Sequence, residues 1–262
     1  MHKIESADGT VIAFDQIGSG PPLIIVAGAS CDRSVDAALA DELARHMTVL
    51  NYDRRGRGDS GDTQPYAVAR EIDDIRALTD AAGGSASLLG LSSGAVLAAR
   101  AAADGVPVDR LIMWEPPFSL DDEARRRTSE YAARLGGLLA ENRRGDALAL
   151  FMSLVGMPEE VIEGMRHSPH FQQGLALAHT LAYDAAVMGD GSIPEDTLTR
   201  IQAPTLLLAG SRSPAFLCAA AERAAAAIPD ARQAVLADQD HNVAPDVIAP
   251  VVARFTGTTH DV

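Results

Sequence analysis

Positive charge and cysteine are scarce in this sequence. Lysine occurs only at Lys3, and 22 Lys and Arg residues stand against 36 Asp and Glu residues, giving a formal net charge of −14. Nucleic acids and anionic membranes bind through clustered positive charge, so we expect neither as a partner. A small molecule of neutral or apolar character is the expected ligand. Cys31 and Cys218 are too few for a disulfide framework, and buried free thiols are the better interpretation.

Long apolar runs are also missing. No stretch approaches the length needed to cross a bilayer, and residues 1–8 are polar, without the apolar centre of a signal peptide. We therefore expect a cytoplasmic protein. Hydrophobic residues make up 47% of the 262 residues, which is enough for a sizeable core in one large domain or two small ones. The oligomeric state is left open, with a homodimer as one option.

Patterns that predict strands and helices alternate along most of the chain. The expected strands are residues 2–6, 11–17, 23–26, 48–52, 87–89, 108–114, 204–209 and 232–237, the first two forming a hairpin. The expected helices are residues 33–45, 66–82, 93–103, 215–228 and 246–255. Alternation of this kind predicts an α/β fold, with a mostly parallel twisted sheet and helices on both faces.

Residues 118–199 interrupt this alternation, because they predict helices throughout and no obvious strand. We expect residues 1–117 and 200–262 to form the core, and residues 118–199 to be inserted as a helical cap. The cap would cover the carboxyl-terminal edge of the sheet, where open α/β sheets bind their ligands.

The most informative stretch is Gly90-Leu91-Ser92-Ser93-Gly94, which follows an apolar strand and precedes an Ala-rich helix. In that context the G-x-S-x-G pattern predicts a sharp turn with Ser92 exposed at its apex. Gly90 and Gly94 have no Cβ to collide where strand and helix approach each other. The helix amino terminus favours negative charge developing at the same point. The pattern alone is common, and an ordinary strand-to-helix turn is the alternative.

A serine nucleophile needs a base, and histidine is the usual one. Seven histidines are present, of which His2, His46 and His260 are expected to be solvated. The cap contains His167, His170 and His179, which either line a ligand pocket or have a structural role. A metal site would need carboxylate or cysteine ligands at matching spacing, which are absent, so we expect neither metal nor cofactor.

Residues 53–60, Asp-Arg-Arg-Gly-Arg-Gly-Asp-Ser, are rich in arginine and glycine. The Lys and Ser/Thr spacing of a phosphate-binding P-loop is missing from them. We therefore expect a structural turn, held by a network of Asp and Arg side chains internal to the segment.

Four segments together carry a resemblance that covers nearly the whole chain. They are Ala27-Gly28-Ala29, residues 53–60, the Ser92 turn, and Asp240-His241-Asn242 before the last helix. The sequence resembles an α/β-hydrolase with a helical cap, similar to fungal hydrolases of the zearalenone-lactonase type and to soluble actinobacterial hydrolases. The resemblance implies Ser92 as the nucleophile and His241 as the base. It also implies an oxyanion hole formed by the backbone N–H groups of Ala29 and Ser93.

The acid of the implied triad is not in its usual place. The family carries it in the loop after the strand that follows the cap, where this chain has Ser213 and no carboxylate. Glu115 ends the strand before the cap and gives the chain order Ser92, Glu115, His241, so we expect it to replace the acid. The alternatives are that Glu115 pairs with a cap arginine, or that Asp238 or Asp240 takes the role.

The expected function is hydrolysis of a carboxylic ester or lactone of a small, fairly apolar molecule through an acyl-enzyme. Met152, Met157, Met188 and His179 of the cap are the predicted substrate-binding residues, because methionine adapts to varied apolar ligands. Haloalkane dehalogenases and epoxide hydrolases of this family need an aspartate as the nucleophile. This chain has Ser92 at that position, so we expect neither activity. The alternatives are a cofactor-free lyase or cyclase, or a non-catalytic small-molecule-binding protein on the same fold.

Overall fold

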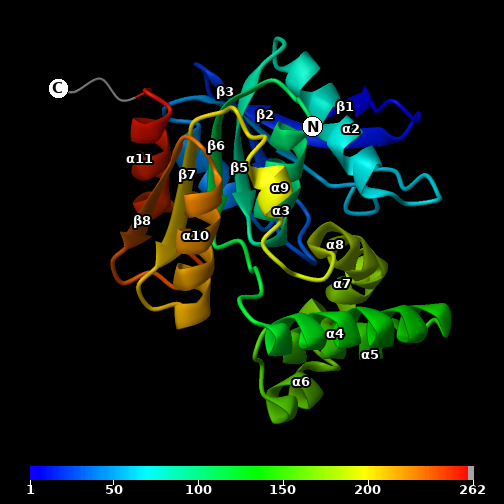
Figure 1. Cartoon of the computed structure of the whole chain (residues 1–262). Coiled ribbons are helices and arrows are strands. Elements are labelled where there is room, and N and C mark those ends of the chain that lie inside the picture. The colour runs from blue at the N-terminus through cyan, green and yellow to red at the C-terminus, as the bar shows by residue number, and fades with distance from the viewer. Residues whose placement is uncertain (259–262) are drawn as a thin grey trace.

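An eight-stranded sheet forms the centre of the computed structural model, which describes residues 1–258 (Figure 1). Six strands, β3 to β8, run parallel, and β1 and β2 pair antiparallel at one edge. In spatial order they are β1 (His2–Glu5), β2 (Val11–Ile17), β4 (Thr48–Tyr52), β3 (Pro22–Val26), β5 (Ala86–Leu91), β6 (Val108–Trp114), β7 (Thr205–Gly210) and β8 (Ala231–Leu236).

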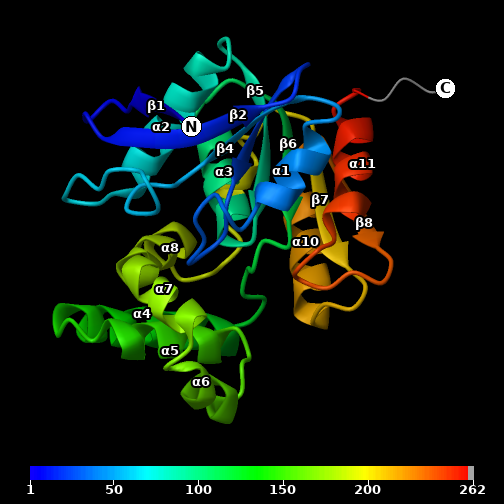
Figure 2. The same cartoon turned by 180° about the vertical axis from the view of Figure 1, so that it is seen from behind.

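Helices pack on both faces of this sheet. One face carries α2 (Val68–Ala81), α3 (Ser93–Ala103) and α10 (Ala215–Ala227), and the other carries α1 (Ala37–Leu43) and α11 (Pro245–Phe255), as Figures 1 and 2 show from opposite sides. Because successive strand side chains point to opposite faces, a strand buried on both faces is apolar throughout. The predicted α/β fold, with a mostly parallel sheet between two helical layers, is confirmed.

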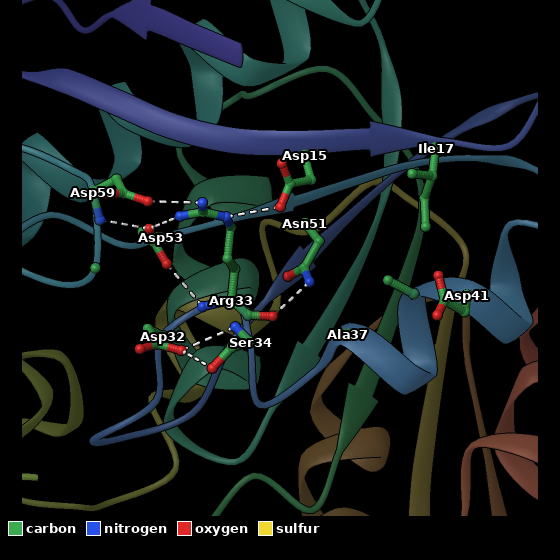
Figure 3. Close-up of a pocket in the computed structure, with 12 residues that line it drawn as sticks. Asp15, Ile17, Asp32, Arg33, Ser34, Ala37, Asp41, Asn51, Asp53 and Asp59 are labelled. Carbon is green, nitrogen blue, oxygen red and sulfur yellow. Dashed lines mark hydrogen bonds and ion pairs between the residues drawn. The ribbon is translucent and has the colours of Figure 1, made fainter. Parts of the chain in front are cut away.

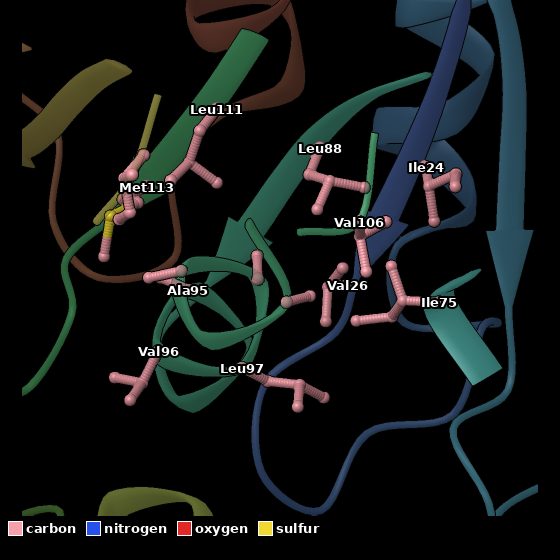
Figure 4. Close-up of a cluster of buried hydrophobic side chains, with 14 of the residues drawn as sticks. Ile24, Val26, Ile75, Leu88, Ala95, Val96, Leu97, Val106, Leu111 and Met113 are labelled. Carbon is pink, nitrogen blue, oxygen red and sulfur yellow. The ribbon is translucent and has the colours of Figure 1, made fainter. Parts of the chain in front are cut away.

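Strand β3 shows how one apolar run serves two cores. Ile24 and Val26 belong to the cluster under α2 and α3, whereas Leu23 and Ile25 belong to the cluster under α1 and α11, and all four are fully buried. Figure 4 shows Ile24 and Val26 beside side chains of α2, β5 and α3. Each such side chain contributes about 1.5–3 kcal/mol on burial, so β3 and its neighbours form a rigid base for the loops that follow them.

The chain between β6 and β7 is helical. It contains α4 (Asp122–Ala140), α5 (Arg144–Leu154), α6 (Glu159–Met165), α7 (Pro169–Leu177), the 3₁₀ turn η1 (Ala178–Thr180), α8 (Leu181–Met188) and α9 (Glu195–Leu198). Figures 1 and 2 both place α4 to α7 beyond one end of the sheet, below it in each view. Helix α8 packs against α3. The division of the chain into separate core and cap domains stays a prediction.

The first helix is shorter than the sequence predicts. Residues 33–45 were expected to be helical, but α1 spans only Ala37–Leu43. The cause is a long-range contact, because the Arg33 side chain and backbone N–H both bond to the Asp53 carboxylate at the end of β4. Asp32 Oδ1 also accepts hydrogen bonds from the backbone N–H and hydroxyl of Ser34. These bonds hold residues 32–36 as turns instead of a first helical turn.

Candidate active site

Ser92 occupies a strained turn between β5 and α3. Its backbone has φ 54° and ψ −121°, a conformation that L-residues adopt rarely and that costs about 1–3 kcal/mol. Its N–H donates to the Trp114 carbonyl on β6 at 2.9 Å. A Cβ on Gly90 would lie well under 3.0 Å from backbone atoms of α3, and one on Gly94 equally close to the carbonyl oxygens of Val26 and Ala27 at the end of β3. The two glycines are therefore required by close backbone approach, as the sequence predicts.

Glu115 and His241 are joined by a short hydrogen bond. Glu115 Oε2 lies 2.6 Å from His241 Nδ1, and Glu115 Oε1 accepts from the Gly210 N–H at 2.7 Å. Glu115 is fully buried at the end of β6, whereas the His241 side chain is 44% exposed. The Trp114 indole N–H holds the His241 carbonyl at 3.0 Å. In the part of the chain that the structure describes, the other ring nitrogen of His241, Nε2, has no hydrogen-bond partner.

The charge state of Glu115 suits this contact. Burial acts to raise the pKa of Glu115, but the hydrogen bonds from the His241 ring and the Gly210 N–H outweigh it, so the pKa lies below its ordinary value. The carboxylate is therefore ionised at neutral pH and accepts both bonds. An ionised partner fixes the histidine tautomer with the proton on Nδ1.

The competing acids make no such contact. Asp240 Oδ1 accepts from the Asn242 N–H, and among the described residues neither Asp238 nor Asp240 bonds to the His241 ring. The hydroxyl of Ser213 lies close enough to Glu115 to help lower its pKa, although among the described residues it makes no well-aligned hydrogen bond. Glu115 is bonded to His241 and not to a cap arginine. Within the same residues no hydrogen bond joins Ser92 to His241, a contact that often tightens only when substrate binds.

Both predicted oxyanion donors lie at the Ser92 turn. Ser93 is the first residue of α3, and its N–H is one of the unpaired donors at the helix amino terminus. Ala29 lies in the loop after β3. A Cβ on Gly28, the residue before it, would be 3.2 Å from the Leu91 carbonyl oxygen and 3.4 Å from Ser92 Cβ. The loop after β3 therefore passes directly beside the Ser92 turn.

The apolar side chains that pack near Ala29 are not the predicted methionines. Ala29 belongs to a cluster with Leu135, Ala147 and Leu181, together with the partly buried Tyr131, Leu138, Leu139, Leu150, Phe151 and Ala185. Met152 and Met157 lie in another cluster, internal to α5, α6 and α7, and Met188 packs against the main core. The i, i+4, i+7 spacing of Tyr131, Leu135 and Leu138 was the sequence signal for the side chains of α4 that pack beside Ala29.

The predicted substrate-binding residue His179 lies at the junction of η1 and the loop after β4. Its Nε2 is 3.5 Å from Asp62 Oδ2, its ring meets that of Tyr183 edge-on, and burial lowers its pKa. It is not a member of the cluster that contains Ala29. Of the other histidines, His2 and His167 are exposed. His260 and the side chain of His170 lie outside the described part of the chain.

The arginines of residues 53–60 find their partners far away in the sequence. Arg54 binds Glu71 at 2.7 and 2.8 Å, and Arg55 binds Asp74 at 2.8 and 2.7 Å. Arg57 binds Asp184 of α8 at 2.8 Å. The prediction of a network internal to the segment is therefore wrong, because a buried guanidinium has donors pointing outward that a neighbour on the same turn does not reach.

A pocket of about 630 Å³ opens between β2, β4 and α1, away from this site (Figure 3). Arg33 lies at its centre and bridges Asp15, Asp53 and Asp59. None of the predicted catalytic residues lines it. In residues 1–258 no group of three or more His, Cys, Asp or Glu side chains is arranged to hold a metal ion. Within that range no helix has both the length and the apolar character to span a bilayer.

The sheet order, the strained serine turn and the histidine bonded to a buried carboxylate define the class of fold. The model of the alpha/beta hydrolase family matches residues 23–253, so the chain belongs to the α/β-hydrolase family, as its resemblance implied. An α/β-hydrolase from Sphaerobacter thermophilus is 49% identical, with a TM-score of 0.88 and coverage of 97% of this chain and 99% of that one.

More distant relatives have named activities. The enol-lactonase from Burkholderia xenovorans is 22% identical with a TM-score of 0.69, covers 98% of this chain and 100% of its own, and shows the fold alone. N-formylmaleamate deformylase from Pseudomonas putida is 38% identical over 106 residues. That match spans 39% of this chain and 40% of the relative, so less than half of either protein is compared.

Proposed function

We propose that the protein is a serine hydrolase that cleaves a carboxylic ester or lactone of a small, fairly apolar molecule. The observation that carries the proposal is the 2.6 Å contact between Glu115 and His241, at the edge of the sheet where the Ser92 turn lies. A non-catalytic binding protein on this fold has no need of an ionised carboxylate that orients a histidine. A nucleophile, a base and an acid together favour acyl transfer.

In this reaction Ser92 Oγ attacks the carbonyl carbon while His241 Nε2 takes the hydroxyl proton. Glu115 keeps the proton on Nδ1 and stabilises the imidazolium. The N–H groups of Ala29 and Ser93 bind the oxyanion. His241 returns its proton to the leaving alkoxide, which stays attached to the acyl group when the substrate is a lactone. Water, deprotonated by His241, then attacks the acyl-enzyme and releases the acid and Ser92.

The substrate class follows from the side chains around Ala29. Tyr131, Leu150 and Phe151 are partly buried there and offer aromatic and aliphatic surface to an acyl group. We expect short acyl and aromatic esters or lactones to react and phosphate esters not to react. Because one relative is a deformylase, an N-formyl amide belongs in the same substrate panel.

The test combines covalent labelling with turnover. A fluorophosphonate should add one label to the wild type, and Ser92→Ala should abolish both the label and the hydrolysis of p-nitrophenyl butyrate. Ser85→Ala is the matched control, because Ser85 lies just before β5 and, among the described residues, its hydroxyl bonds only to Asp109. Persistence of the label in Ser92→Ala would show that the nucleophile is wrongly assigned. Phosphatase activity without esterase activity would refute the substrate class.

A further inference from the structure

Asp184 of α8 lies where three segments of the core meet. Its Oδ1 accepts from Arg54 Nη1 at 2.7 Å and from the Ser93 hydroxyl at 2.9 Å, and its Oδ2 accepts from Arg57 Nη2 at 2.8 Å. All four side chains are buried. A single carboxylate of the helical segment between β6 and β7 thus holds both the arginine loop after β4 and the first residue of α3.

The same arginines hold the loop after β3. Arg57 Nη1 donates to the Gly28 carbonyl at 2.5 Å and to the Cys31 carbonyl at 3.1 Å, and Arg54 Nη1 donates to the Ala27 carbonyl at 3.3 Å. In a planar trans peptide the C=O and the following N–H point in opposite directions. An anchored Gly28 carbonyl therefore fixes the direction of the Ala29 N–H.

Both donors of the proposed oxyanion hole are thus fixed by one carboxylate. The Ala29 N–H is set through Arg57, and Ser93 is held directly through its hydroxyl. We infer that Asp184 is a positioning residue for the oxyanion hole, acting through Arg57 and Ser93. This inference rests on the proposed function, because it assigns a role in the stabilisation of the same oxyanion.

Charge keeps this arrangement in place. Burial acts to raise the pKa of Asp184, but Arg57 and Arg54 outweigh it and hold the pKa below its ordinary value. Asp184 and Glu71 together balance the two buried guanidinium groups of Arg54 and Arg57. Without the Asp184 charge, Arg57 would lose its only carboxylate partner among the described residues and would release or reorient the Gly28 carbonyl.

Displacement of an oxyanion donor has a recognisable kinetic signature. The donor binds charge that develops in the transition state, so its loss lowers kcat and leaves ground-state binding nearly unchanged. Loss of one complete donor costs about 10²–10³ in kcat in a well-studied protease. Displacement of a donor that is still present should lower kcat by less, on the order of 10–10²-fold.

The test compares Asp184→Asn with Asp74→Asn. Asp74 of α2 is the buried partner of Arg55 in the arginine loop, and among the described residues neither side chain bonds to Ser93 or to the loop after β3. On one p-nitrophenyl ester, Asp184→Asn should lower kcat by about 10–10²-fold with KM within about threefold. Its affinity for a trifluoromethyl ketone, which forms an oxyanion on Ser92, should fall by a similar factor. Asp74→Asn should lower the Tm but keep kcat.

A milder variant keeps the inference open to refutation if Asp184→Asn does not fold. Ser93→Ala removes one hydroxyl and leaves the arginine pairs and the backbone N–H intact, so kcat should fall by about 3–10-fold, as for one hydrogen bond. Equal kcat losses in the Asp184 and Asp74 variants, or a raised KM at constant kcat, would overturn the inference. A wild type without esterase activity or fluorophosphonate labelling would refute the proposed function itself, and this inference with it.

Discussion

At the scale of single residues, Glu115 is the carboxylate that contacts His241, and its role as the acid of the triad is a proposal. The loop after β7 supplies only Ser213, whose hydroxyl cannot balance an imidazolium. Glu115 follows the neighbouring strand β6, and its backbone has φ 44°, a strained value for a residue other than glycine. The hydrogen bonds that the side chain accepts from the His241 ring and from the Gly210 N–H offset the free-energy cost of this strain.

We predict that Glu115→Gln lowers kcat by about 10²–10⁴-fold with little change in KM, because an amide has the same shape but no charge for the imidazolium. Steady-state kinetics on one ester would measure this, with thermal unfolding as a check on the fold. Ser213→Ala, in the loop after β7, is the comparison and should lower kcat far less, because the Ser213 hydroxyl helps to lower the pKa of Glu115 but cannot balance an imidazolium. A larger loss in Ser213→Ala would mean that the acid is wrongly assigned.

At the scale of elements, the turn from β5 to α3 sets the position of Ser92, the proposed nucleophile. A Cβ on Gly94 would collide with the carbonyl oxygens of Val26 and Ala27, which belong to the end of β3 and cannot move independently of the sheet. We predict that Gly94→Ala destabilises the protein by about 1–3 kcal/mol or more. Denaturant unfolding would measure it.

The matched control for this prediction is Gly136→Ala in α4, where a new Cβ meets no atom within 4 Å. Alanine favours the helix by about 0.5–1 kcal/mol over glycine, so this variant should be slightly stabilised. A Gly94→Ala protein as stable as the Gly136→Ala protein would show that the strand and helix have more room than the structure indicates.

The elements also show where sequence reasoning succeeds. All eight strands were predicted within about two residues, because apolar runs and Gly, Pro and Asp turns are local signals. Chain order and the resemblance also pointed to Glu115 and His241, whose side chains are in contact, and their catalytic roles stay a prediction. Helix α1 was predicted too long, because the bond between Arg33 and Asp53 joins residues 20 positions apart and leaves no local pattern.

At the scale of the whole molecule, the least predictable contacts are those between buried charges. Arg57 and Asp184 are separated by 127 positions, and Arg54 and Asp184 by 130. Nothing in the spacing of residues 53–60 indicates that their partners lie in α2 and α8. Beside Ala29, spacing indicates Tyr131, Leu135 and Leu138, but no local pattern indicates that Phe151 packs there and Met152 does not.

These buried pairs also decide where the net charge lies. Arg54, Arg55 and Arg57 are fully buried against carboxylates, so they do not offset the acidic surface of a chain with a net charge of −14. A field of this sign repels anions approaching the site and is screened by salt over about 10 Å at 0.1 M ionic strength.

We therefore predict that kcat/KM is lower for mono-p-nitrophenyl succinate, an anionic ester, than for p-nitrophenyl valerate, a neutral ester of similar length. The ratio should be about tenfold in low salt and should shrink as salt is raised to roughly 0.5 M, where the Debye length falls to a few ångströms. The neutral ester is the control and should respond little to salt. A preference for the anionic ester would refute the prediction. A ratio that salt does not change would assign the discrimination to the apolar side chains around Ala29 instead of to the charge of the whole molecule.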